Sequence, residues 1–275
     1  MFSTLLTKVV ARLTDPELPV RVDACVALRA FLEPFEAEDL AMLRPLLPAI
    51  LRDFFALMGE VENEEMITTL EALIETFSDD MAQYAVQLAQ HLAQAFWRIQ
   101  QQEEENDDDD DDTAALAAYG CVRTIGTLLE AVSTLPHLYT QLEDILFPIM
   151  DRYLSQDGES IFEEVVQMLS YFTFLSPELS PRLWTLWPKL HEAVTTWAID
   201  YFDEVLVCLD NYISRGTEVF LGSANYLQSA NQVRRLCLCS VGETYLCAAC
   251  VIVNLCMYLE TSVIVNSGLM YGYAH

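Results

Sequence analysis

The sequence has few positive charges. Its 275 residues include only 14 Lys and Arg against 42 Asp and Glu, so the formal net charge is −28 and the isoelectric point is near 4.2. A protein that binds DNA or RNA neutralises phosphates with Lys and Arg, so this balance argues against nucleic acid as a direct partner. A chain of this charge attracts basic proteins instead.

Catalytic and cofactor-binding motifs are also missing. The sequence contains no G-x-S-x-G, G-x-x-x-x-G-K-[ST], G-x-G-x-x-G or H-E-x-x-H pattern, and its four histidines, His91, His137, His191 and His275, lie far apart. Nucleophilic hydrolysis, phosphate-loop nucleotide binding and a zinc protease site therefore have no support. We expect no enzyme activity, no cofactor and no metal. The first residues lack the cleavage site of a secretory signal, so we expect a cytosolic or nuclear protein.

Apolar residues, by contrast, make up 53% of the sequence, and up to about residue 221 they recur at helical spacing. We expect about ten helices of roughly 13–20 residues, one of them over residues 179–197, and no strand. The second helix of each pair is expected to begin near residues 18, 62, 113, 158 and 199, a spacing of roughly 41–51 residues. This period is typical of HEAT and armadillo arrays. The sequence therefore predicts an all-α HEAT-repeat solenoid of about five helix pairs over residues 1–221.

An acidic block interrupts this pattern at residues 103–112, EEENDDDDDD. It could be a domain linker, a cation site or a loop between two helices. The repeat resumes after it, and removing roughly eight to ten residues restores the period, which disfavours a linker. A calcium loop needs spaced oxygens and a turn-forming Gly, which disfavours a cation site. An acidic loop remains, either without a specific role or capturing basic segments. The candidate partner-binding residues are Glu103, Glu104, Glu105, Asp107, Asp108, Asp109, Asp110, Asp111 and Asp112.

Residues 222–275 are expected to form a divergent Cys-rich apolar tail, with two basic and two acidic residues and five of the eight cysteines. Cys237-x-Cys239 and Cys247-x-x-Cys250 have zinc-like spacing, but their apolar surroundings disfavour a zinc site. The apolar run Tyr245–Leu259 is short for a bilayer, which disfavours membrane insertion. An alternative C-terminus, a retained intron or a gene-model error would also produce such a tail. The four tryptophans, Trp97, Trp184, Trp187 and Trp197, are expected in the core.

Three stretches of the sequence resemble one family. VRVDACVALRAFLE, EVENEEMITTLEALIETFSDDMAQYAVQLAQHLAQAFWRI and DYFDEVLVCLDNYISRG are similar to the middle and C-terminal repeats of the importin-β superfamily, in particular its importin-7/importin-8 branch. The resemblance covers about residues 1–221. The family's N-terminal repeats, which carry most of the contact with the GTPase Ran, have no counterpart here.

The resemblance implies a function in nuclear import. It implies binding of basic protein cargo, passage through the nuclear pore by contacts with Phe-Gly nucleoporins, and release by Ran. It also implies a location in the cytoplasm and nucleus, including the nuclear envelope. A HEAT scaffold for protein–protein interaction without a transport role is the alternative.

Overall fold

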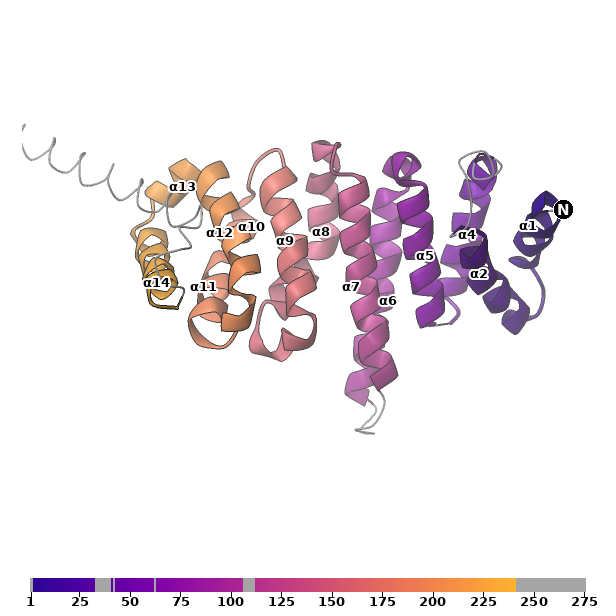
Figure 1. Cartoon of the computed structure of the whole chain (residues 1–275), viewed down its shortest axis with the longest axis horizontal. Coiled ribbons are helices and arrows are strands. Elements are labelled where there is room, and N and C mark those ends of the chain that lie inside the picture. Colours follow the sequence, from indigo (N-terminus) through magenta and orange to yellow (C-terminus); the bar gives the residue numbers. More distant parts are fainter. Residues whose placement is uncertain (1, 33–40, 42, 62, 106–111, 241–275) are drawn as a thin grey trace, which may run out of the picture. The chain divides into compact units, whose positions relative to one another are not determined.

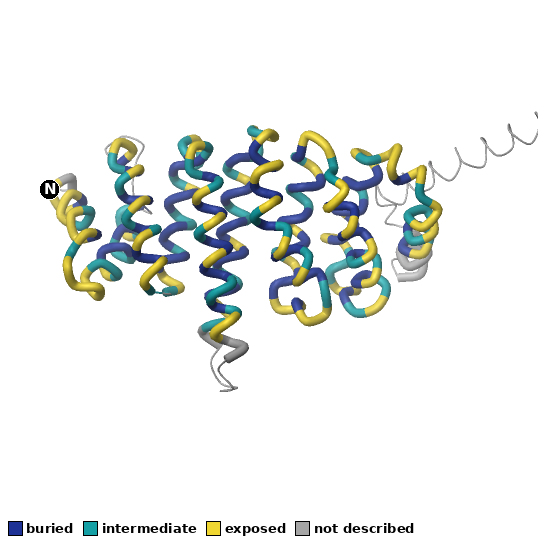
Figure 2. Tube along the Cα trace, turned by 180° about the vertical axis from the view of Figure 1, so that it is seen from behind, coloured by how far each residue is buried: buried dark blue, intermediate teal, exposed yellow. Residues whose placement is uncertain are grey.

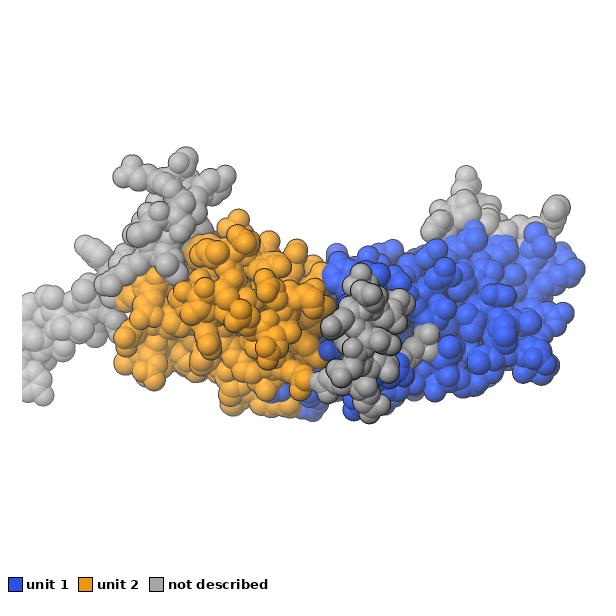
Figure 3. Space-filling view, turned by 90° about the horizontal axis from the view of Figure 1, so that it is seen from below, with its two compact units in different colours: residues 1–149 blue, residues 150–275 orange. Residues whose placement is uncertain are grey.

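The computed structural model describes residues 2–32, 41, 43–61, 63–105 and 112–240. The chain divides into two compact units, Met1–Ile149 and Met150–His275 (Figure 3). Every regular element in the described ranges is helical. The expected all-α fold of paired helices is confirmed, and it is a HEAT-type solenoid.

In the first unit, two series of helices stack in chain order (Figure 1). The second helices of successive pairs pack side by side, α2 on α5 and α5 on α7, and the first helices do the same, α4 on α6. This is the arrangement expected when each pair buries its apolar faces against its neighbours. The elements are α1 Phe2–Arg12, α2 Leu18–Leu32, η1 Arg44–Leu46, α4 Leu47–Met58, α5 Glu64–Thr76, η2 Ser78–Gln83, α6 Ala85–Glu105, α7 Asp112–Ala131 and α8 Pro136–Tyr153, which runs into the second unit.

In the second unit, α9 packs on α12, and α11 packs on both α12 and α14. The second helices therefore begin at residues 18, 64, 112, 162 and 202, within four residues of the expected positions. The elements are η3 Gln156–Ile161, α9 Phe162–Leu175, α10 Pro181–Trp184, α11 Trp187–Thr196, η4 Ile199–Tyr201, α12 Phe202–Arg215, α13 Thr217–Leu221 and α14 Ala224–Ser240.

Local signals in the sequence account for several helix ends. The Asp15 carboxylate accepts the Glu17 backbone N–H at 3.1 Å, which shapes the turn after α1. The Asn63 side chain accepts the Met66 backbone N–H at 3.0 Å and caps the start of α5. Glu64 and Glu65 then lie in the first turn of α5, where the helix dipole favours carboxylates.

The single helix expected over residues 179–197 was wrong. The structure has a short helix α10, capped by the Ser180 hydroxyl, followed by α11. The break has a covalent cause, because Pro188 has no N–H to donate to the Trp184 carbonyl and its ring would clash there. The apolar pattern does not reveal the break, because α10 buries Leu183 and Trp184 and α11 continues with buried Trp187 and Leu190.

The core is built from the facing sides of neighbouring helices in each unit (Figure 2). Leu28, Leu70 and Leu129 are at most 1% exposed and lie on stacked second helices of the first unit. Cys25, Cys121 and Cys208 are buried thiols, as expected. Burial raises the pKa of the Cys25 thiol to about 12, so it behaves as a small apolar side chain.

Helical packing continues past the expected boundary at residue 221. The indole of Trp187 on α11 donates from Nε1 to the Ser229 hydroxyl of α14 at 2.8 Å. The Trp184 and Tyr226 rings are stacked with centroids 4.9 Å apart. Ala230 and Val233 are buried. The first part of the expected tail thus packs as a further repeat helix, whereas residues 241–275, with the zinc-like and apolar stretches from Cys247 onward, lie outside the described residues.

Candidate partner-binding site

The acidic block runs from the last turn of α6 to the first residue of α7, and these two helices pack against each other. Phe96 and Ile99 of α6 and Ala118 and Cys121 of α7 are buried at 3% exposure or less. The small residues of α7 permit close approach of the two helices. The ends of this hairpin that flank the block extend beyond the neighbouring α5 (Figure 1). Leu116, one turn into α7, is 53% exposed.

The candidate residues divide between helix ends and an undescribed segment. Glu103, Glu104 and Glu105 belong to the last turn of α6, and Asp112 is the first residue of α7. The expected loop over residues 103–112 is corrected at both ends, because the Ala- and Gln-rich helices continue into the acidic block. The side chains of residues 103–113 lie outside the described part, as do Asp107–Asp111 as a whole.

Hydrogen bonds between neighbouring repeats measure the length of the insertion. Arg98 binds Met58 O across 40 positions, Cys208 binds Val166 O across 42, and Arg215 binds Phe174 O across 41. The contact that spans the acidic block is longer, because Arg123 on α7 binds the Glu71 carboxylate on α5 across 52 positions. The block therefore adds about ten residues to one repeat, consistent with the expected insertion.

Many basic side chains form ion pairs or hydrogen bonds within the chain. Arg21 forms a two-pronged pair with the Glu60 carboxylate at 2.8 and 2.6 Å, which holds the pKa of that carboxyl below its usual value. Other basic side chains donate to the carbonyls that end a helix one repeat earlier, which are left without intrahelical partners. In the described part of the chain, the basic side chains that bind carboxylates or backbone carbonyls include Arg12, Arg21, Arg44, Arg52, Arg98, Arg123, Lys189 and Arg215.

The acidic block itself contains no Lys or Arg. Its nine carboxyl groups occupy ten consecutive positions. The helix dipole favours Asp112 at the start of α7 but opposes Glu103, Glu104 and Glu105 at the end of α6. A bound cationic group would relieve this repulsion, so the hairpin end is chemically suited to a basic partner.

Other residues considered in the sequence have structural surroundings. The His91 ring stacks on Phe55 with centroids 4.3 Å apart, and burial followed by the Arg98 charge lowers its pKa. In the described part of the chain no group of three or more His, Cys, Asp or Glu side chains is arranged to hold a metal ion. Within the same ranges, no helix is long and apolar enough to span a bilayer.

The tryptophans are only partly as expected. Trp184 and Trp187 are buried at 6% and 2% exposure. Trp97 and Trp197 are intermediate in solvent exposure, so the expectation that they lie in the core was wrong for these two residues. A fixed apolar periodicity does not distinguish a side chain in the middle of an interface from one at its rim.

Stacked helix pairs with a repeat near 40 residues and a strongly acidic surface define a helical-repeat binding protein. Comparisons with known proteins identify its family more closely. No family model and no solved structure matches the chain. It is 50% identical to an importin beta-like SAD2 homolog of Arabidopsis thaliana over 80% of this chain and 21% of that protein. It is 31% identical to a probable importin-7 homolog of Dictyostelium discoideum over 82% of this chain and 21% of that protein.

A third relative, importin-8 of Mus musculus, is 28% identical over 86% of this chain and 23% of that protein. The chain therefore spans about a fifth of the length of these curated relatives. The matched segment belongs to the importin-β family, a family of nuclear transport receptors, as the resemblance of the three stretches indicated.

Proposed function

We propose that this chain is a cargo-binding portion of a nuclear transport receptor and that it captures basic protein segments at the acidic block, residues 103–112. The observation that carries the proposal is the match to importins along most of the chain, combined with an excess of carboxylates that the internal ion pairs leave uncompensated.

The attraction comes from summed charge rather than from a shaped pocket. Exposed charges act over a Debye length of about 8–10 Å at physiological salt, so nine neighbouring carboxyl groups act together on a basic segment. Such a site tolerates many basic sequences, and its affinity falls with added salt. The exposed side chain of Leu116 offers an apolar contact beside the block.

The wider transport role is part of the same proposal. It comprises weak contacts with Phe-Gly nucleoporins, regulation by Ran, and movement between cytoplasm and nucleus, including the nuclear envelope. It includes no enzymatic step. Its support is the family of the chain.

Binding of a fluorescently labelled, Lys- and Arg-rich peptide, measured by anisotropy at about 50 and about 150 mM salt, tests the proposal. The informative variant replaces Asp107–Asp112 by Asn. We expect it to weaken binding at least about tenfold at the lower salt, because it removes six of the nine charges. The matched control removes the same charge from exposed sites elsewhere in the first unit: Glu17, Asp23, Glu64, Glu65, Glu75 and Asp79, each changed to its amide.

If the control variant weakens binding as much as the Asn variant, net charge alone attracts the peptide and the acidic block has no special role. Absence of binding to the parent chain at the lower salt also refutes the proposal.

A second measurement separates transport from scaffolding. Immobilised Phe-Gly repeats should retain the chain weakly, and repeats with Phe replaced by Ser should not. A chain that binds basic peptides but is not retained by Phe-Gly repeats is better described as a non-transport HEAT scaffold.

A further inference from the structure

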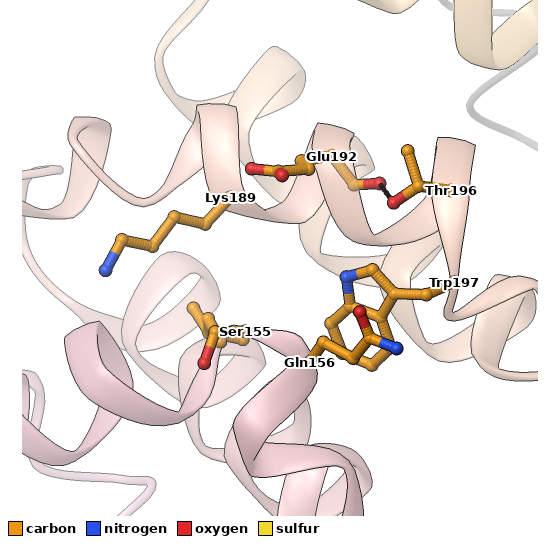
Figure 4. Close-up of a pocket in the computed structure, with 7 residues that line it drawn as sticks. Ser155, Gln156, Lys189, Glu192, Thr196 and Trp197 are labelled. Carbon is orange, nitrogen blue, oxygen red and sulfur yellow. Dashed lines mark hydrogen bonds between the residues drawn. The ribbon is translucent and has the colours of Figure 1, made fainter.

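A separate cavity of 510 Å³ lies within the second unit (Figure 4). Leu154, Ser155 and Gln156, at the end of α8 and the start of η3, form one side. Residues of α11 and its C-terminal end form the other: Lys189, Glu192, Thr196 and Trp197. Gln156, Glu192 and Thr196 are exposed, so the cavity opens to solvent. Its size is typical of sites that hold a small ligand or a side chain, about 300–1,000 Å³.

The charges at the cavity favour a cation over an anion. The Lys189 ammonium pairs with the Asp151 carboxylate at 2.7 Å and also donates to the Asp151 carbonyl oxygen. Figure 4 shows its side chain extending away from Trp197. Within the described residues, Glu192 has no such ion pair. The three groups together carry one net negative charge, in a chain of net charge −28.

Trp197 supplies an aromatic wall with a fixed position. Its backbone N–H donates to the Ala193 carbonyl at 3.1 Å and ends α11. Its ring packs at 66° on Phe162, a fully buried residue of α9, with centroids 4.7 Å apart. The indole is only partly buried and lines the cavity. A cation over an indole face is attracted by the negative face of the ring.

The polar lining suits a planar group with several donors. The Ser155 hydroxyl donates to the Arg152 carbonyl at 2.9 Å, which leaves its oxygen free to accept. The Gln156 amide oxygen and the Glu192 carboxylate are further acceptors on opposite sides of the cavity (Figure 4). A guanidinium has five N–H donors in one plane and stacks on aromatic faces, whereas an ammonium is a compact charge.

We propose that this cavity receives an arginine side chain of a basic protein partner, with its guanidinium over the Trp197 indole and paired with Glu192. This inference rests on the proposed function in that the partner is the same class of basic protein. The cavity adds a shaped subsite for one residue to the unspecific attraction of the acidic block.

The test uses N-acetylarginine amide, which carries one guanidinium and is too short to need the acidic block. Titration into the full chain is followed by the indole N–H resonances of the four tryptophans in two-dimensional NMR spectra. We expect one resonance to shift with a dissociation constant of roughly tens of millimolar or weaker, because one exposed cation–π contact and one exposed ion pair are each weak interactions. Trp197→Phe, which keeps a ring against Phe162, assigns that resonance by its loss.

Three comparisons make the result decisive. N-acetylnorleucine amide, which is neutral, should not shift the resonance. N-acetyllysine amide with a free ε-amino group should bind at least about threefold more weakly than the arginine compound, because it lacks the planar donor array. Glu192→Gln should weaken arginine binding about threefold to tenfold, whereas Glu159→Gln, an exposed change of equal charge in η3, should alter it less than about twofold.

A failed cavity assignment can be distinguished from a failure of the proposed function. No shift with the arginine compound, an equal shift with the neutral one, or equal effects of the two Glu variants overturns the cavity assignment. Salt-sensitive peptide binding that depends on Asp107–Asp112 would still stand in that case. Conversely, arginine binding at Trp197 survives replacement of Asp107–Asp112 by Asn if the cavity acts as proposed.

Discussion

Replacing Gly158 by Ala tests how closely η3 passes over the end of α8. Gly158 is buried, and its N–H donates to the Ser155 carbonyl at 2.9 Å. A Cβ atom on Gly158 would overlap the Tyr153 carbonyl oxygen and lie 2.8 Å from the Tyr153 Cα. The need for glycine here comes from this close approach of two backbone segments, since its φ is not positive.

The loss of unfolding free energy on Gly158→Ala depends on the Tyr153 backbone, which an added Cβ would have to displace. Overpacking usually costs about 1–3 kcal/mol, and the obstacle here is backbone that cannot change rotamer. We therefore expect the free energy of unfolding of the second unit to fall by about 2–3 kcal/mol, near the top of that range. With a urea slope of about 1–3 kcal/mol/M, the midpoint falls by roughly 1 M.

Equilibrium urea unfolding followed by tryptophan fluorescence measures this change. Three of the four tryptophans, Trp184, Trp187 and Trp197, belong to the second unit, so fluorescence reports mainly on it. The control is Gly126→Ala in the interior of α7, where no atom lies within 4 Å of an added Cβ. This change should stabilise the chain by about 0.5–1 kcal/mol in a transition followed by circular dichroism. If Gly158→Ala leaves the fluorescence midpoint unchanged, the close approach is not a packing constraint.

Two further predictions concern charged groups of the second unit. Arg215 donates to the Phe174 and Ser176 carbonyls at 2.5 and 2.7 Å, so Arg215→Met should cost about 1–2 kcal/mol of unfolding free energy by the same fluorescence assay. The exposed Lys8→Met change in the first unit, followed by circular dichroism, should cost almost nothing, and equal costs for the two changes would contradict the role assigned to the Arg215 hydrogen bonds. Burial raises the pKa of the Asp210 carboxyl, whose Oδ1 has no hydrogen-bond partner in the described part of the chain. Ionisation therefore opposes folding at neutral pH. Asp210→Asn should raise the urea midpoint at pH 7, and the gain should shrink as the pH falls below the folded-state pKa and vanish below the unfolded-state pKa; a gain that persists at low pH would argue against this cause.

Much of the helical framework is predictable from the sequence because each helix carries its own signal. Asn63 marks the start of α5, Gly59 follows the end of α4, and the starts of the second helices lie within four residues of the expected positions. The error at Pro188 came from following the apolar period past a residue that breaks the backbone ladder. The sequence pattern did not reveal that α6 continues to Glu105 and that α7 begins at Asp112, since Glu is a good helix former even at an unfavourable helix end.

The acidic block and the cavity also differ in how far the sequence reveals them. The acidic block is a run of like charges, so composition alone reveals it. The cavity combines Gln156 with Trp197, residues about one repeat apart, and neither has a distinctive sequence context. A recurring offset near 40 residues between basic side chains and helix-ending carbonyls could have suggested the hydrogen bonds of Arg98, Lys189 and Arg215, but Arg and Lys occur at many other positions.

The sequence alone determined the helical class, the repeat period, the importin family and the excess of negative charge. These properties depend on periodicity and composition, which are local or additive along the chain. Only the tertiary structure decided which cations are neutralised inside the fold, how far packing continues past residue 221, and that Glu192, Trp197 and Gln156 share one cavity. Such features depend on contacts between residues about one repeat apart, and those contacts are set by the packing of whole helices rather than by any local pattern.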